Sequence, residues 1–383
     1  MKISERSKIP PFYALEVLRE ANALESRGVK VIHLETGEPG SRLPNIIAKA
    51  ANDALKNKKL GYTESLGLPE LRMRIANHYL KYYGIKIPYQ RIVITTGSSA
   101  GLLLSIIAAF NVGDKIAICE PGYPAYRNMV KSLGGEIVTI PTNIENGFQL
   151  NVSLLEKLDT KINGLIVASP ANPTGSMLEN KEVRNIANWC IDNEVQIISD
   201  EIYHGITYDN KANSFLEFNP NTIVTNGFSK YFAMTGWRIG WLVLPDELTI
   251  TIEKLLQNLY ISAPTISQYA ALKAFDCSNE LEQNILTYKI NRDILYNSLK
   301  NSGFGKICNP NGAFYLYAHL GQLSKSSEDF CKKMLEEAHV AATPGIDFDK
   351  SKGCEYVRFS YAGETKNIKI ASLAINKWIQ SKK

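Results

Sequence analysis

The sequence predicts an α/β fold: a mostly parallel seven-stranded sheet with helices on both faces, joined to a smaller α+β domain. Strand-like and helix-like segments alternate from residue 91 onwards. Most of the strand-like segments are continuous apolar runs, which is typical of strands buried on both faces of a parallel sheet. The chain has 383 residues, more than one hydrophobic core usually serves, so we expect two domains.

The composition is that of an ordinary globular enzyme, with 45% hydrophobic and 21% charged residues. The net charge is +5, but the densest basic run, residues 56–59, only closes an amphipathic segment, so no nucleic-acid partner is expected. The longest apolar run, residues 102–110, is too short to span a membrane, and residues 1–6 lack the apolar core of a secretory signal. Six cysteines without metal-ligand spacing indicate reduced thiols, a cytoplasmic location and no metal site.

The elements follow from apolar spacing along the chain. An N-terminal arm carries a helical pattern over residues 14–24 and a short strand over 29–34, and amphipathic helices are expected at 45–58 and 69–82. The strands of the large sheet are expected at 92–95, 116–119, 137–140, 165–168, 195–199, 223–225 and 239–244.

After residue 245 one long helical stretch is expected to run to about residue 275. A smaller mixed region follows, with a helix near 281–301, strands near 314–318 and 356–361, and a closing helix from Asn367. We therefore assign residues 45–275 to a large domain. Residues 1–44 and 276–383 together form the predicted small domain, because the arm is too short to be a domain of its own.

The most informative stretch is residues 227–240, which contains Lys230. A lysine amine condenses with an aldehyde to give a stable but exchangeable imine. Ser229 and Arg238 offer a hydroxyl and a planar fork of charged donors, which suit an anion. Pyridoxal 5′-phosphate carries both an aldehyde and a phosphate, so the stretch predicts a site for this cofactor. The competing interpretation is a buried loop in which Lys230 only extends its amine to solvent.

Polar residues also follow other predicted strands, at the edge where an open α/β sheet binds its ligands. Asp200 could pair with a protonated ring nitrogen, and the phenol of Tyr203 could reach a ring oxygen; a cap for the next segment is the alternative for Asp200. Asn172, between two prolines, offers a donor amide in a stiffened loop, or simply belongs to a turn.

Three further positions are candidates on weaker grounds. Ser98 and Ser99 stand where a strand meets an apolar helix, so they either hold a phosphate or only cap that helix. Tyr123 could stack on a flat ring, although core packing is the usual fate of a tyrosine. Arg358 lies among apolar residues, where a guanidinium needs either a substrate carboxylate or an internal salt bridge.

With these residues in order, the chain resembles the fold-type I pyridoxal-phosphate enzymes, and specifically the aspartate-aminotransferase-like class I/II aminotransferases. The resemblance extends from about Gly37 to Tyr361. Its specific pieces are Asn172-Pro173-x-Gly175, Asp200-Glu201-Ile202-Tyr203, Ser229-Lys230 and Gly236-Trp237-Arg238-Ile239-Gly240. Each piece alone is a weak pattern, but their shared order favours the family over the competing interpretations.

The resemblance implies that Lys230 carries the cofactor as a Schiff base and then acts as the base in a ping-pong transfer from an L-amino acid to a 2-oxo acid. Asp200 would hold the ring proton, Tyr203 and Asn172 the ring oxygen, and Tyr123 would stack on the ring. The implied phosphate ligands are Ser98, Ser99, Ser229 and Arg238, and the implied substrate-carboxylate ligands are Arg358, Gly37 and Asn172. In the family a tyrosine of the neighbouring subunit also reaches the phosphate; Tyr62 matches it, which implies a homodimer with shared active sites.

The sequence leaves the substrate and one alternative activity open. Arg42 could reach a second carboxylate of a dicarboxylic substrate or could be an exposed loop cation, so an alanine-type, aromatic or broad donor is equally compatible. A C–S β-lyase of the same fold would share Lys230, Asp200 and Arg358. A regulator with an N-terminal DNA-binding domain is not expected, because only 36 residues precede Gly37.

Overall fold

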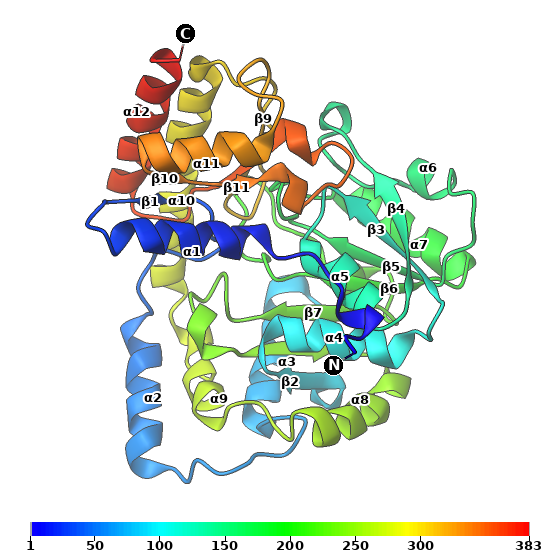
Figure 1. The fold of residues 1–383 in the computed structure, drawn as a ribbon. Helices are drawn as coiled ribbons and strands as arrows, with labels where there is room; N and C mark the ends of the chain where they lie inside the picture. Colours follow the sequence, from blue (N-terminus) through cyan, green and yellow to red (C-terminus); the bar gives the residue numbers. More distant parts are fainter. Residues whose placement is uncertain (1, 383) are drawn as a thin grey trace.

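The computed structural model describes residues 2–382 and contains the predicted α/β architecture (Figure 1). Seven strands form one sheet in the order β2-β8-β7-β6-β5-β3-β4. Neighbours from β7 to β4 run parallel, whereas β8 is antiparallel to both β2 and β7. The predicted seven-stranded, mostly parallel sheet is therefore confirmed.

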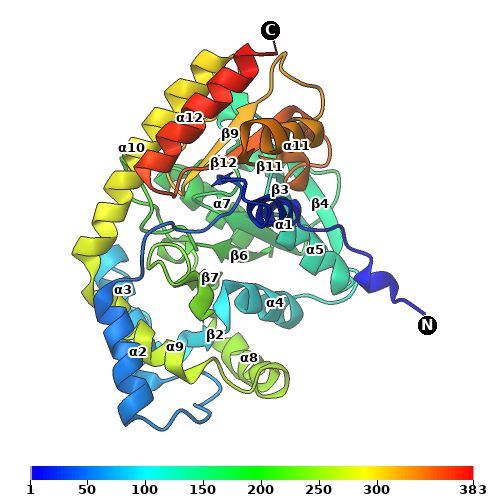
Figure 2. The same cartoon turned by 60° about the vertical axis from the view of Figure 1, so that its left-hand side comes forward.

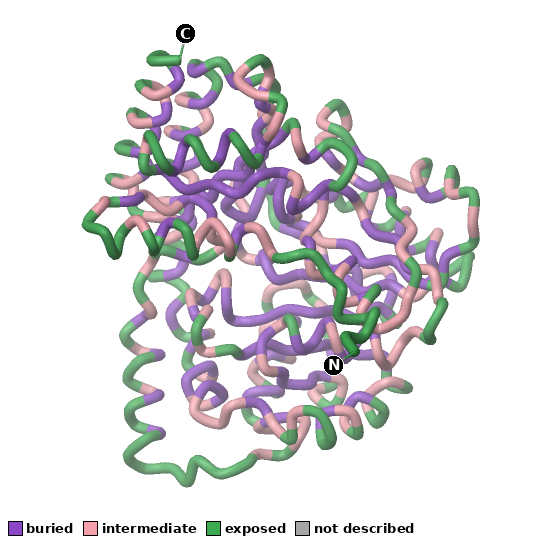
Figure 3. Tube along the Cα trace, in the orientation of Figure 1, coloured by how far each residue is buried: buried purple, intermediate pink, exposed green. Residues whose placement is uncertain are grey.

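The strands are buried because their apolar runs face helices on both sides (Figure 3). All side chains of β2 and β8 are buried, and so are all but one of β5 and of β6. Each strand lies within a few residues of its predicted position. The bounds are β2 Ile92–Thr95, β3 Lys115–Glu120, β4 Glu136–Pro141, β5 Gly164–Ala168, β6 Gln196–Asp200, β7 Ile223–Gly227 and β8 Gly240–Val243.

Helices cover both faces of this sheet, as Figure 2 shows from a second side. One face packs against α4 (Gly97–Ala109), α5 (Pro124–Ser132) and α8 (Asp246–Leu259). The other face packs against α6 (Val152–Leu155) and α7 (Asn180–Asp192) at one end and against three helices at the other. These three are α2 (Asn45–Asn57), α3 (Pro69–Tyr83) and α9 (Thr265–Ala271).

The C-terminal region builds a second, smaller layer. Strands β11 (Thr343–Pro344), β12 (Tyr356–Ser360) and β9 (Tyr315–His319) form an antiparallel sheet in that order. Helices α10 (Ser278–Ser302), α11 (Ser327–Ala338) and α12 (Thr365–Gln380) pack around it. This confirms the predicted smaller α+β part of the fold.

The N-terminal arm packs with this C-terminal layer. Its helix α1 (Tyr13–Glu25) contacts β10 (Val340–Ala341) and β11, and its strand β1 (Ile32–His33) pairs in parallel with β10. The division at residues 275/276 stays a prediction. Helix α10 spans that boundary region, because Leu281 near its start belongs to the core of the large sheet and Leu295 to the core of the small one.

One predicted element differs from the structure. The stretch expected as a single helix to about residue 275 is two helices, α8 and α9, separated by residues 260–264. The break lies where Ile261 adopts a left-handed φ of 66° and where Pro264 precedes the first turn of α9, which a continuing helix does not tolerate. Within residues 2–382, no helix combines the length and apolar character needed to cross a membrane.

Candidate active site

Most of the candidate residues gather at the carboxyl edge of the large sheet because they follow, or end, strands that terminate there. Ser98 and Ser99 lie in the first turn of α4, after β2, and Tyr123 follows β3. Asn172 lies in the loop after β5, and Asp200 is the last residue of β6. Ser229 and Lys230 come directly after β7. The parallel sheet thus delivers side chains from five connections to one edge.

The amine of Lys230 points inwards. Its Nζ donates a hydrogen bond of 2.6 Å to the carbonyl oxygen of Gly37 and lies 5.9 Å from the ring centre of Tyr203. Burial, and secondarily the positive charge of Arg358, lowers the pKa of Lys230 from 10.5 to about 8. The interpretation of Lys230 as a solvent-directed side chain is therefore wrong, and a substantial fraction of its amine is uncharged near neutral pH.

Asp200 is a buried carboxylate with neutral hydrogen-bond donors. It accepts a hydrogen bond of 2.7 Å from the hydroxyl of Tyr126 and one of 3.2 Å from the backbone nitrogen of Ile202. Burial raises the pKa of Asp200, whereas these donors and the charge of Lys230 act in the opposite direction. Within residues 2–382, no cationic side chain lies within 4.0 Å of this carboxylate, so it has capacity for a positively charged ligand group.

Arg358 in β12 is 1% exposed and has no carboxylate within 4.0 Å in the described part of the chain. Its guanidinium donates hydrogen bonds to Asn172 Oδ1 at 2.9 Å and to Thr343 Oγ1 at 3.1 Å, and a third one to the carbonyl oxygen of Glu35. It lies 4.5 Å from the ring centre of Tyr315. The buried Nε has no partner, so of the five donors two remain for an anion. The internal salt bridge considered for Arg358 is absent from residues 2–382.

A second group of donors surrounds the start of α4. Arg238 lies against Gly97, since a Cβ at position 97 would be 2.7 Å from Arg238 Nη2. A Cβ on Gly240 would similarly lie 2.7 Å from the backbone nitrogen of Ser98. With Ser229 just after β7, this group combines helix N–H groups, hydroxyls and a guanidinium, the donor set that binds a phosphate.

The remaining candidates line the space between Asp200 and Arg358. The hydroxyls of Tyr203 and Tyr315 share a 2.6 Å hydrogen bond. Tyr123 is half-buried. Burial, and secondarily the nearby negative charge of Asp200, raises the pKa of Tyr123 to about 12. Gly37 has to be glycine, because a Cβ there would lie 2.2 Å from the hydroxyl of Tyr315. The single exception to this clustering is Tyr62, whose side chain is 81% exposed on the single chain.

Three residues of the site were missed at the sequence level. Tyr126 lies one helical turn after Tyr123, and this spacing could have indicated a second aromatic residue at the same edge. Tyr315 and Thr343 belong to the small sheet, and their contacts with Gly37 and Arg358 arise only from packing between the two layers. No local sequence pattern could have found these two.

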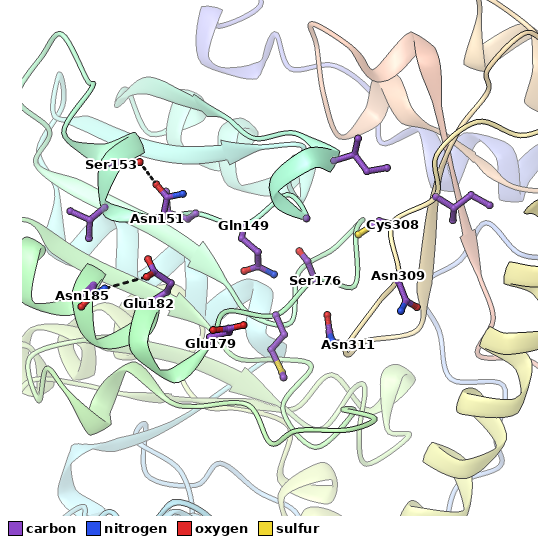
Figure 4. Close-up of a pocket in the computed structure, with 16 residues that line it drawn as sticks. Gln149, Asn151, Ser153, Ser176, Glu179, Glu182, Asn185, Cys308, Asn309 and Asn311 are labelled. Carbon is purple, nitrogen blue, oxygen red and sulfur yellow. Dashed lines mark hydrogen bonds between the residues drawn. The ribbon is translucent and has the colours of Figure 1, made fainter.

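A wide groove of about 750 Å³ lies elsewhere on the surface (Figure 4). It runs between residues 144–153, 176–185 and 307–311, and it includes none of the candidate residues. Its labelled side chains are mostly amides with two glutamates, for example Asn185, which donates 3.2 Å to Glu182. The groove has no lysine or arginine among its lining residues, so the chemistry belongs to the edge of the sheet.

The fold and this site define the class of protein: an enzyme of the aspartate aminotransferase fold. The solved aspartate aminotransferase of Thermus thermophilus with maleate superposes with a TM-score of 0.94 at 29% identity, covering 98% of this chain and 99% of that one. The family model of "Aminotransferase class I and II" matches residues 29–375. The chain therefore belongs to the class I and II aminotransferase family.

Two relatives resemble the chain over nearly its whole length. A valine–pyruvate aminotransferase of Mycobacterium tuberculosis is 40% identical over 99% of both chains. A (5-formylfuran-3-yl)methyl phosphate transaminase of Methanocaldococcus jannaschii is 42% identical over 94% of both. These matches decide between the activities that the resemblance left open: the chain is an aminotransferase, and the prediction of this activity is confirmed.

Proposed function

We propose that the chain is a pyridoxal 5′-phosphate-dependent aminotransferase that moves an amino group from an L-amino acid to a 2-oxo acid in a ping-pong cycle. The observation that carries the proposal is the buried amine of Lys230, which lies in one site with the unpaired carboxylate of Asp200 and the unpaired guanidinium of Arg358. The family membership supports it, because its members generally use this cofactor.

The donor set fits each part of the cofactor. Ser98, Ser99, Ser229 and Arg238 would hold the phosphate, since the absence of a side chain at Gly97 and Gly240 lets Arg238 and the start of β8 lie close to the first turn of α4. Asp200 would pair with the protonated ring nitrogen, for which it has no competing cation in residues 2–382. Tyr203 and the amide nitrogen of Asn172 would hold the ring oxygen, and Tyr123 would stack on the ring.

When bound, the cofactor supplies an aldehyde that captures amines and a ring that withdraws electrons from the substrate α-carbon. The chain supplies the rest. Lys230 would hold the aldehyde and then, with a pKa near 8, remove and return the α-proton as a general base. Arg358, assisted by Asn172 and by the backbone at Gly37, would grip the substrate carboxylate and so hold the α-carbon towards Lys230.

This assignment is tested by reducing the cofactor-loaded protein with borohydride and locating the cofactor by peptide mass spectrometry. We expect the adduct on Lys230 in the wild type and no adduct in Lys230→Ala, which also loses the yellow absorbance and the activity. An adduct on a different lysine, or full turnover by Lys230→Ala, would show that the amine of Lys230 is not the reactive one.

We also propose a homodimer in which Tyr62 of each subunit reaches the phosphate of the other. Two hydrogen bonds hold the segment around Tyr62. The carbonyl oxygen of Gly61 accepts one of 2.6 Å from Thr265 Oγ1, and the hydroxyl of Thr63 accepts one of 3.0 Å from Gln268 Nε2. Tyr62 itself points outwards from this fixed segment. A rigidly held, exposed aromatic side chain supports a contact with a second chain.

For the substrate, we propose an amino donor without a second carboxylate, and a location in the cytoplasm. Arg42, the only residue that the sequence suggested for a second carboxylate, is exposed. The name of the Mycobacterium tuberculosis relative, with its apolar amino acid, points the same way. Mixing the loaded enzyme with single amino acids, without acceptor, tests this: valine and alanine should bleach the cofactor absorbance faster than aspartate. The cytoplasmic location is supported by six free cysteines.

A further inference from the structure

Glu201 follows Asp200 directly but points away from the cofactor edge into the protein. Its side chain is 1% exposed. Within residues 2–382, no lysine or arginine lies within 4.0 Å of its carboxyl group; the nearest basic atom is Nδ1 of His204, 3.5 Å from Oε2. A buried charge without a cation is costly. Whether Glu201 is ionised or protonated can be inferred from its hydrogen bonds.

The two carboxyl oxygens of Glu201 have different surroundings. Oε1 accepts three hydrogen bonds, from Ser214 Oγ at 2.8 Å, from the backbone nitrogen of Phe215 at 3.2 Å and from Ser199 Oγ at 3.2 Å. Oε2 is buried and has no hydrogen-bond partner. This asymmetry is that of a carboxylic acid, whose carbonyl oxygen accepts and whose other oxygen carries the proton.

His204 completes the argument. Its Nε2 lies 2.8 Å from the carbonyl oxygen of Ser169, which can only accept, so Nε2 carries the hydrogen. Burial lowers the pKa of His204 to about 3, so the ring is neutral and Nδ1 accepts, here from the hydroxyl of Tyr83 at 2.6 Å. The single lone pair of Nδ1 is therefore occupied, and His204 has no hydrogen to offer to Oε2. An ionised Oε2 would be a buried charge without a donor, whereas a protonated Oε2 carries no charge. Burial accordingly raises the pKa of Glu201 to about 8.

The hydrogen-bonded chain ends at the loop that carries Asn172. Ser169 begins this loop, directly after β5, and Asn172 Oδ1 accepts 2.9 Å from Arg358. The link therefore runs from Tyr83 at the end of α3, through His204, to the loop that supports the substrate-binding arginine. A shift of Ser169 would move Asn172 and leave a buried donor of Arg358 without its partner.

We propose that Glu201 is held as a neutral carboxylic acid and that Glu201, His204 and Tyr83 position the Asn172 loop for binding of the substrate carboxylate. The positioning role rests on the proposed function, because it assumes that Arg358 grips that carboxylate. The three are positioning residues that act through Ser169. Other titratable groups that face this chain of hydrogen bonds are Glu217, His78, Lys211 and Tyr79.

The protonation is tested by infrared difference spectra of the full-length protein, wild type minus Glu201→Gln, from pH 6 to pH 10. We expect the C=O stretch of a protonated acid at pH 6 and its loss around pH 8. Glu217→Gln is the matched control, because Glu217 accepts a 2.9 Å hydrogen bond from the backbone nitrogen of Ser214 as a helix cap, and this variant should keep the band. Absence of the band at pH 6 would overturn the proposal.

The positioning role is tested by steady-state kinetics of the cofactor-loaded enzyme. Tyr83→Phe should raise KM for both substrates about fivefold, the equivalent of one net hydrogen bond, with kcat changed less than about twofold. Tyr82→Phe, which alters the neighbouring phenol that stacks on His78 at 5.4 Å, should change neither value. Unchanged KM in Tyr83→Phe would overturn the positioning role.

Glu201→Gln provides the second variant, since its amide oxygen can accept from the same three donors and its NH₂ group, like a protonated Oε2, carries no charge. It should keep the wild-type KM at pH 7 and lack the rise in KM that we expect for the wild type above pH 8, where Glu201 would ionise. Inactivity of Glu201→Gln would indicate an ionised pair with His204 and contradict the proposal. If the wild type itself bound no cofactor, the proposed function would fail, whereas the infrared result would still decide the protonation of Glu201.

Discussion

The low pKa of Lys230 can be measured directly on the protein without cofactor. A shift from 10.5 to about 8 means that about one amine in ten is uncharged at pH 7, some 300-fold more than for an ordinary lysine. We expect an amine-selective reagent, applied from pH 6 to pH 11, to modify Lys230 with a midpoint near pH 8. Peptide mass spectrometry separates this midpoint from those of exposed lysines in the same sample.

The causes of the shift can be tested by two variants with opposite signs. Arg358→Gln removes a neighbouring positive charge, so the midpoint of Lys230 should rise; Glu38→Gln removes a negative charge, so it should fall. Because the folded chain binds this proton more weakly than the unfolded chain, the free energy of unfolding should increase between pH 8 and pH 10.5. A wild-type midpoint above 10, or shifts of the same sign in both variants, would refute the reasoning.

Three further predictions concern other parts of the site. Arg358→Lys loses the planar fork and should raise KM by about 100-fold, equivalent to about 2–3 kcal/mol, with a smaller effect on kcat; an unchanged KM would exclude Arg358 as the carboxylate ligand. Gly37→Ala forces a Cβ to within 2.2 Å of the hydroxyl of Tyr315 and should cost about 1–3 kcal/mol, seen as a lower denaturation midpoint; wild-type stability would contradict this packing. Tyr62→Ala alone should lose most activity, and refolding it together with inactive Lys230→Ala should restore about a quarter of the wild-type activity if sites are shared across a homodimer; a fully active Tyr62→Ala, or no gain on mixing, would contradict shared sites.

Much of the fold and of the candidate site could be predicted from the sequence, because buried strands have a recognisable run of apolar residues. A strand covered on both faces needs a continuous apolar run, and most strands of the large sheet have one, whereas the edge strand β4 is largely not buried. Asp200 ends one of these strands and the loops after two others contain Asn172 and Lys230, and the parallel order of the strands places the three at one edge.

What the sequence could not provide are contacts between segments that are distant along the chain. Lys230 bonds to a carbonyl 193 positions away, at Gly37, and Arg358 bonds to Asn172 at a separation of 186. No periodicity encodes such pairs, because they depend on how the C-terminal layer and the N-terminal arm close over the sheet. The break between α8 and α9 was missed for a related reason, since a helical pattern continues across it while Ile261 leaves helical geometry.

The charges of the site explain why its ligands should stabilise the protein. Lys230, Arg238 and Arg358 place three cationic groups around the carboxyl edge, against the single buried carboxylate of Asp200. Desolvation of Lys230, Arg358 and Asp200 opposes folding, and the internal hydrogen bonds of Arg358 leave two of its donors unused. A phosphate at the start of α4 and a carboxylate at Arg358 would supply the missing negative charges, and a protonated ring would supply the missing cation for Asp200. If the proposed cofactor and substrate bind there, their charges would match the same groups that make the chain alone less stable, so both ligands should raise the free energy of unfolding.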